Sequence, residues 1–204
     1  MSATPFDRVL AYFTGDADVL ATNALRRYFG PDDPYTGASF DTLSDGEHPD
    51  RFTASDIVAV SMLSVTVPAK TTLSLLGGEA DELLSKIPAD ASLWTNPELL
   101  DRDGAAWQLW TLVAAHHDVG RTIASKLLAA KRPALLPVYD THVAAALELG
   151  ASYWGIWQEV ARHPEVNVLI DSIEKARSAA GIASIVSDLR IIDVVVWMRQ
   201  HGGN

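Results

Sequence analysis

Residues 116–147 read HHDVGRTIASKLLAAKRPALLPVYDTHVAAAL, and this stretch decides the fold. Apolar residues recur at helical spacing on both sides of Asp118-Val119-Gly120, which predicts two helices joined by a tight hairpin. A connector with two prolines follows, and Asp140 then opens the next helix. We therefore expect a helix-hairpin-helix followed by an Asp-capped helix over residues 105–149.

Helical periodicity continues along the rest of the chain, and no alternating strand pattern is long enough to predict a sheet. Polar stretches rich in Gly, Pro and Asp predict loops at residues 30–51 and 88–102. The expected fold is all-α, a single domain over residues 1–204, and the first loop is compatible with a second lobe. The expected helices span residues 5–13, 16–29, 54–65, 68–76, 79–87, 103–117, 121–131, 140–149, 153–162, 165–180 and 184–201.

Composition excludes several classes of protein. With 48% hydrophobic residues the chain has the content of a packed globular protein. It contains no cysteine, which excludes disulfides, cysteine–zinc sites and iron–sulfur clusters and fits a cytoplasmic location. The first ten residues lack the pattern of a signal peptide, and the apolar run Ile191–Met198 is too short to span a bilayer. We expect a soluble protein without a membrane partner.

The charge distribution singles out one segment. Sixteen basic and 26 acidic residues give a net charge of −10, which opposes binding to nucleic acid and anionic membranes. Residues 116–146 are an exception, with four basic and two acidic residues. Within them, Lys126, Lys131 and Arg132 could reach phosphate groups, or they could form an ordinary solvated helix end.

The hairpin in this segment has the features of an anion site. Its turn needs a residue that tolerates positive φ, a role for Gly120 with support from Asp118. The N–H groups of Gly120, Arg121 and Thr122 would then point outward at a helix N-terminus, where the helix dipole helps to hold a phosphate. Hairpins of this kind contact the DNA backbone by position and do not read sequence.

The hairpin together with the later Y-D-T-H segment resembles the helix-hairpin-helix DNA glycosylase superfamily, with an endonuclease III-like core. The motifs that carry this resemblance are V-G-R-T-I-A-S-K-L-L from Val119 and P-V-Y-D-T-H-V from Pro137. The resemblance implies a two-lobed helical bundle with a cleft bounded by the hairpin and Asp140. It also implies that the chain belongs to a diverged bacterial branch of this superfamily. It also places Asp140 at the position of the catalytic aspartate.

This sequence departs from the family pattern at four places. Thr122 stands where the nucleophilic lysine would be, so no Schiff base or lyase step is available there. His117-Asp118 replaces the usual Pro-Gly of the hairpin, and Thr66 stands where a glutamine would end a buried upstream helix. The iron–sulfur cluster at the C-terminus needs cysteine ligands, and this sequence has no cysteine.

The implied function is monofunctional N-glycosidic hydrolysis of a base in DNA, without a cofactor. DNA would bind through residues 118–122, with Lys126 reaching a phosphate. Two other interpretations remain open: a non-catalytic binding or scaffold protein that kept the fold, and an enzyme acting on a small nucleoside or other ligand. The sequence indicates no particular protein partner.

Each candidate site residue also has an ordinary structural interpretation. Asp140 could stabilise the charge that develops on a sugar, or it could only cap a helix by accepting from the N–H of His142 or Val143. His142 could orient Asp140 or donate toward the leaving base, or it could be a surface histidine. Aromatic side chains that would line a pocket for an extruded base, or pack in a core, are Tyr139, Trp107 and Trp110.

No metal site is expected from the histidines of this segment. His116 and His117 are adjacent, and neighbouring positions on a helix diverge by about 100°, so both rarely bind one metal. In the last helix, Arg190 and Asp193 are spaced for an i,i+3 ion pair, with Trp197 on the same face.

Overall fold

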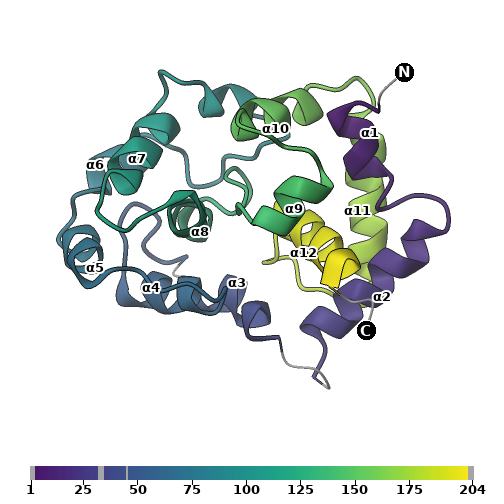
Figure 1. Cartoon of the computed structure of the whole chain (residues 1–204), viewed down its shortest axis with the longest axis horizontal. Coiled ribbons are helices and arrows are strands. Elements are labelled where there is room, and N and C mark those ends of the chain that lie inside the picture. Colours follow the sequence, from purple (N-terminus) through teal and green to yellow (C-terminus); the bar gives the residue numbers. More distant parts are fainter. Residues whose placement is uncertain (1–2, 32–34, 45, 202–204) are drawn as a thin grey trace. The chain divides into compact units, whose positions relative to one another are not determined.

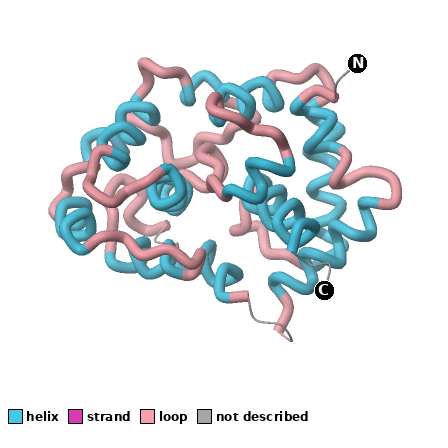
Figure 2. The backbone as a smooth tube through the Cα atoms, in the orientation of Figure 1, coloured by secondary structure: helices cyan, strands magenta, loops and turns pink. Residues whose placement is uncertain are grey.

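The computed structural model describes residues 3–31, 35–44 and 46–201. Within these ranges the chain forms twelve α-helices and two 3₁₀ helices and no strand (Figure 2). The expected all-α fold class is therefore confirmed. None of these helices combines the length and the apolar character that crossing a bilayer requires.

The chain forms two compact units. Unit 1 combines the described residues of 1–35 and 140–204, whereas unit 2 is the continuous segment 36–139. Asp140 is thus the first residue after the chain returns to unit 1.

Unit 1 is organised around α12. Its elements are α1 (Pro5–Leu10), α2 (Ala17–Phe29), α9 (Thr141–Ala146), α10 (Tyr153–Ala161), α11 (Val166–Ala180) and α12 (Asp188–His201). The last helix packs against α2, α9 and α11 (Figure 1). Every residue from 189 to 196 is buried, as expected for a helix that its neighbours enclose on all sides.

The two charged residues within this buried stretch neutralise one another. Arg190 and Asp193 form the i,i+3 ion pair that their spacing predicts. The Arg190 guanidinium also donates to the Tyr28 hydroxyl on α2 at 2.7 Å. A buried ion pair needs such additional hydrogen bonds to offset its desolvation.

Unit 2 is built around α8. Its elements are η1 (Thr36–Ser39), α3 (Phe40–Leu43), α4 (Ala54–Ser61), α5 (Ala69–Leu76), α6 (Asp81–Leu84), η2 (Pro97–Leu100), α7 (Ala105–Ala114) and α8 (Arg121–Lys131). The central helix packs against α4 and α7 (Figure 1). Residues 124–131 of this helix are all buried.

Both interpretations of Lys131 and Arg132, as phosphate contacts and as an ordinary solvated helix end, are wrong because the two side chains are buried. Lys131 Nζ lies 2.9 Å from Asp56 Oδ2, and both side chains are fully buried. Arg132 is completely excluded from solvent, and its burial lowers the pKa of the guanidinium while Asp50 opposes that shift. The guanidinium donates to the carbonyl oxygens of Pro49, Leu84, Ile87 and Lys131 and to the Asp50 carboxylate.

Several helix boundaries also differ from expectation. The helix that begins at Ala54 ends at Ser61 because the chain turns over residues 62–64, where Ser64 has a φ of 59°. Thr66 therefore lies beyond that helix, and it is exposed. The expected loop at 30–51 contains η1 and α3, which bury Phe40, while residues 32–34 and 45 of that loop lie outside the described residues.

Candidate functional site

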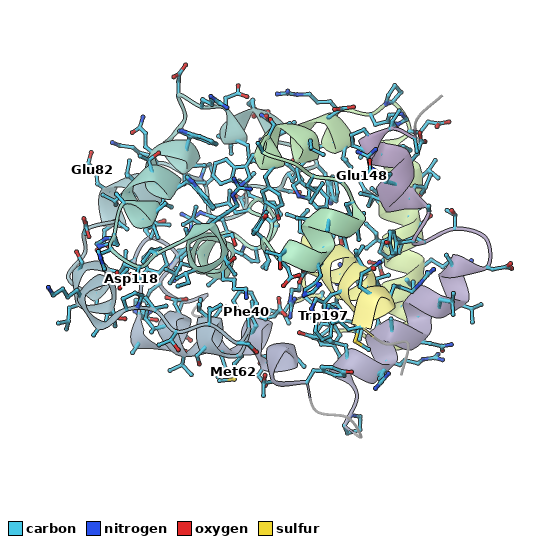
Figure 3. All side chains as sticks on the ribbon, in the orientation of Figure 1. Phe40, Met62, Glu82, Asp118, Glu148 and Trp197 are labelled. Atoms are coloured by element: carbon cyan, nitrogen blue, oxygen red, sulfur yellow. The ribbon has the colours of Figure 1, made fainter. Side chains whose placement is uncertain are left out.

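The hairpin between α7 and α8 has the expected place in the chain but a different turn. Asp118 has a φ of 65°, whereas Gly120 has an ordinary extended backbone with φ −87° and ψ 178°. The assignment of positive φ to Gly120 is therefore wrong. Aspartate tolerates the left-handed region because its short polar side chain can bond locally. The Asp118 side chain is 75% exposed at this turn (Figure 3).

Gly120 is the N-cap residue of α8, and it has no side chain to accept a hydrogen bond from the first amides of the helix. A Cβ at this position would meet no atom within 4 Å, so the backbone here faces open space. The first amides of α8, at Arg121 and Thr122, thus belong to a helix end without a side-chain acceptor. Beside it, His117 Nδ1 lies 2.8 Å from Asp118 Oδ2, so a carboxylate stands next to the positive end of the helix.

Within unit 2 the start of α8 is tied to the connector that leads to Asp140. The Arg121 guanidinium lies 4.9 Å from the centre of the Tyr139 ring. The backbone N–H of Tyr139 donates to Ser125 Oγ at 2.9 Å, and that hydroxyl donates to the Thr122 carbonyl at 3.0 Å. The structure therefore brings together Arg121, Thr122 and Tyr139 of the expected site.

Other expected site residues of unit 2 have different surroundings. Lys126 is buried and donates to the Leu63 carbonyl oxygen at 2.7 Å, so its ammonium group is used inside unit 2. Trp107 and Trp110 are half-buried on α7, and the Arg102 guanidinium lies 5.4 Å from a ring of Trp107. Of the four basic side chains between residues 116 and 146, only Arg121 is exposed.

Asp140 is the N-cap of α9. Its Oδ1 accepts from the N–H groups of His142 at 2.8 Å and Val143 at 3.3 Å, so the expected cap is confirmed. Its Oδ2 has no hydrogen-bond partner among the described residues, and the side chain is half-buried. One carboxylate oxygen is fixed by the backbone while the other remains available.

The far end of α9 is fastened to α1. Arg8 Nε donates to the Leu147 carbonyl oxygen at 2.9 Å, and Arg8 Nη1 lies 3.3 Å from Glu148 Oε2. Glu148 itself has a φ of 53° and stands exposed at the turn that ends the helix (Figure 3). The short helix that carries Asp140 is thus fixed at both ends within unit 1.

A row of aromatic side chains on unit 1 ends at His142, and sequence reasoning missed most of it. His142 contacts His201 with ring centres 4.3 Å apart and planes at 84°. His201 stacks on Trp197 at 4.4 Å and 18°, and Trp197 in turn meets the rings of Tyr28 and Tyr35 edge-on. We call these five residues the ring row; Figure 3 labels Trp197.

One part of the ring row carries a sequence signal. Trp197 and His201 are four residues apart on α12, a spacing that places side chains on the same face of a helix. Their contacts with His142, Tyr28 and Tyr35 join segments distant in sequence and follow only from the tertiary fold. Among the residues that the structure describes, the ring row included, no group of three or more His, Asp or Glu side chains is arranged to hold a metal ion.

Comparison with known proteins places the chain in a family. No curated protein matches it, and neither does any solved structure. The model of DUF6308, a family of unknown function, matches residues 21–200. That range includes the hairpin, Asp140 and four of the five ring-row residues, and the fifth, His201, follows it directly. Since the match covers most of both units, the chain belongs to the DUF6308 family.

Proposed function

We propose that this protein is a monofunctional, glycosylase-like hydrolase that cleaves the N-glycosidic bond of a base in DNA, with Asp140 as its catalytic carboxylate. The observation that carries the proposal is the state of that carboxylate. Oδ1 is held by two backbone amides, while Oδ2 has no partner among the described residues. The cap uses only Oδ1, so Oδ2 is available to interact with a substrate.

Hydrolysis of the N-glycosidic bond requires few protein groups besides the Asp140 carboxylate. As the bond between sugar C1′ and the base nitrogen breaks, the electron pair leaves with the base and positive charge develops on the sugar. The Asp140 carboxylate stabilises that charge, and the oxygen of a water molecule then bonds to C1′. One proton of the water is lost to solvent and the departing base takes up a proton. Because Thr122 replaces a lysine, no covalent sugar intermediate forms at that position.

The start of α8 supports the DNA part of the proposal. The helix begins at a glycine with open space around it, so a phosphate can approach the backbone amides closely. Arg121 is the exposed cation at this end. Asp118 opposes the same interaction, and its charge weakens phosphate binding at the hairpin.

The first test is binding to a short duplex that contains an uncharged abasic-sugar analogue, compared with undamaged duplex across a salt series. We expect preference for the abasic site and an affinity that falls as salt rises. Asp118→Asn should bind more tightly than wild type, because it removes the charge while asparagine still tolerates positive φ. Absence of binding by either protein at low salt would exclude DNA as the substrate.

A second candidate function is hydrolysis of a small nucleoside. The observation that favours it is the burial of Lys126, Lys131 and Arg132, which removes three of the four cations expected to contact DNA. Free nucleosides carry no phosphate and need no basic surface. Release of free base from nucleosides by wild type but not by Asp140→Asn, with no activity on DNA, would establish this alternative.

A further inference from the structure

We infer that the ring row of unit 1 binds a single planar heteroaromatic ring, the nucleobase of a free nucleoside or of an unpaired nucleotide. This inference rests on the proposed function, since it assigns the base-binding surface beside Asp140. The shared chemistry of the two sources is a flat ring with hydrogen-bonding groups on its edge and a sugar attached.

Two histidines, His142 and His201, form the end of the ring row. His142 and His201 are both exposed, and their rings are in contact. The ring nitrogens of His142 have no ion pair and no hydrogen bond with any described residue, and its ring contact is with His201. Two exposed imidazoles therefore contact one another at the surface, and both ring nitrogens of His142 lack a partner among the described residues.

The His201 ring contacts the backbone of its own helix. Its Nδ1 lies 3.1 Å from the carbonyl oxygen of Trp197. A carbonyl oxygen only accepts, so this contact requires a proton on Nδ1, and in the neutral ring the lone pair is then on Nε2. Every nucleobase has an N–H or amino group on its edge that can donate to such a nitrogen.

The two imidazole rings are nearly perpendicular to one another. Because the planes of His142 and His201 are at 84°, the edge of one imidazole lies against the face of the other, and Trp197 covers one face of His201. These ring contacts leave at least one face of His142 uncovered. A nucleobase satisfies both groups at once by stacking on a face and donating to a ring nitrogen. Stacking of this kind contributes about 1–3 kcal/mol per base and accepts any base, because every base has a π face.

Asp140 provides a polar group for the attached sugar. Asp140 Oδ1 accepts from the backbone N–H of His142, so its carboxylate and the His142 ring belong to the same first turn of α9. The remaining oxygen, Oδ2, can interact with a sugar whose base lies on the ring row. A purely apolar ligand would give no partner to Asp140 Oδ2 or to the ring nitrogens of His142.

The binding test follows histidine ring signals and the Trp197 indole signal by NMR while adenosine or uridine is added to the full chain. Ribose 5-phosphate is the probe without a base. We expect saturable shifts at His142, His201 and Trp197 with both nucleosides, none with ribose 5-phosphate, and none at the exposed His117 of unit 2. Equal shifts at His117, or no shift at the ring row, would overturn the inference.

Two variants make the test specific. His201→Leu should lower nucleoside affinity at least tenfold, whereas His117→Leu, at a histidine that is 93% exposed, should leave it unchanged. Equal losses in both variants would overturn the inference, as would ring-row shifts that appear only with Zn²⁺ and never with a nucleoside. Adding a single-stranded oligonucleotide separates the sources: competition with adenosine identifies an unpaired nucleotide, and its absence identifies a free nucleoside.

The inference and the proposed function fail in different ways. Asp140→Asn should still bind adenosine while it loses hydrolysis, because the ring row is intact. Hydrolysis that depends on Asp140 but not on His201 would overturn the inference and leave the proposed function standing. Binding to the ring row without hydrolysis of any nucleoside or DNA would overturn the proposed function alone.

Discussion

Lys131 and Asp56 form an ion pair in which both side chains are fully excluded from solvent. The same oxygen, Asp56 Oδ2, accepts from the backbone N–H of Thr53 at 2.8 Å and from its hydroxyl at 3.1 Å. One carboxylate therefore closes the N-terminus of α4 and neutralises the last residue of α8. The two packed helices of unit 2 are joined at this point.

Lys131→Met should destabilise the protein by about 3–5 kcal/mol, because it leaves a buried carboxylate without its counter-charge. Urea unfolding measures the change. Lys86→Met is the matched control, since Lys86 pairs with Glu82 at 2.7 Å on the exposed surface and its loss should have little effect. Similar losses of unfolding free energy in the two variants would contradict the claim that burial makes the Lys131–Asp56 pair important for stability.

Arg132→Lys should lower the free energy of unfolding by about 3 kcal/mol or more. A lysine ammonium cannot replace the planar guanidinium that serves four carbonyl oxygens and the Asp50 carboxylate, so buried acceptors lose their donors. Denaturant unfolding again measures the loss. Arg121→Lys, at an exposed position, should unfold like wild type. An Arg132→Lys variant as stable as wild type would contradict the stabilising role of the buried guanidinium.

Two glycines should respond differently to alanine. Gly181 follows α11 with a φ of 71°, so Gly181→Ala should cost about 1–2 kcal/mol of stability even though a Cβ there meets nothing. Gly120→Ala has no such strain and should cost less than about 1 kcal/mol, the loss expected at an N-cap. If the hairpin holds a phosphate, Gly120→Ala should nevertheless weaken DNA binding, which a salt-series binding assay measures.

The capping box of α1 should respond to acid. Hydrogen bonds from the side chain and backbone of Thr4 lower the pKa of Asp7 below its ordinary value near 3.8. A carboxyl with a lowered folded pKa stabilises the fold above its unfolded pKa, and this contribution is lost as pH falls through the folded pKa. Thr4→Ala should raise the Asp7 pKa in an NMR titration, and Thr4→Ser should preserve it.

Two variants of Asp140 distinguish its contribution to stability from its proposed role in hydrolysis. Asparagine is as good an N-cap as aspartate, so Asp140→Asn should unfold like wild type, whereas Asp140→Ala should lose about 1 kcal/mol. Both variants should lose N-glycosidic hydrolysis, because neither keeps the carboxylate. Full activity in Asp140→Asn would reduce this residue to a helix cap.

Local signals explain what the sequence predicted well. The bounds of α8 were predicted because Gly120 and Pro133 limit it on both sides, and the cap at Asp140 was predicted because aspartate bonds the amides of a helix start. Both depend on residues a few positions apart. The all-α class follows in the same way from the spacing of apolar residues.

Tertiary contacts explain what the sequence did not predict. Lys126, Lys131 and Arg132 look like surface cations, and only partners 45 or more residues away bring them inside. The ring row likewise joins α2, α9 and α12, whose residues have no common local pattern. At the hairpin, both Asp118 and Gly120 are residue types that tolerate positive φ. In the folded chain only Asp118 of these two adopts it.

The assembly of unit 1 from two distant segments has a consequence for synthesis on the ribosome. Residues 36–139 are continuous, so all the helices that pack around α8 have been made before α9 emerges. The helix α2 is made early, but its partners α11 and α12 come more than a hundred residues later. Its apolar face therefore stays uncovered while the rest of the chain is translated, which is the interval in which a chaperone would be most useful.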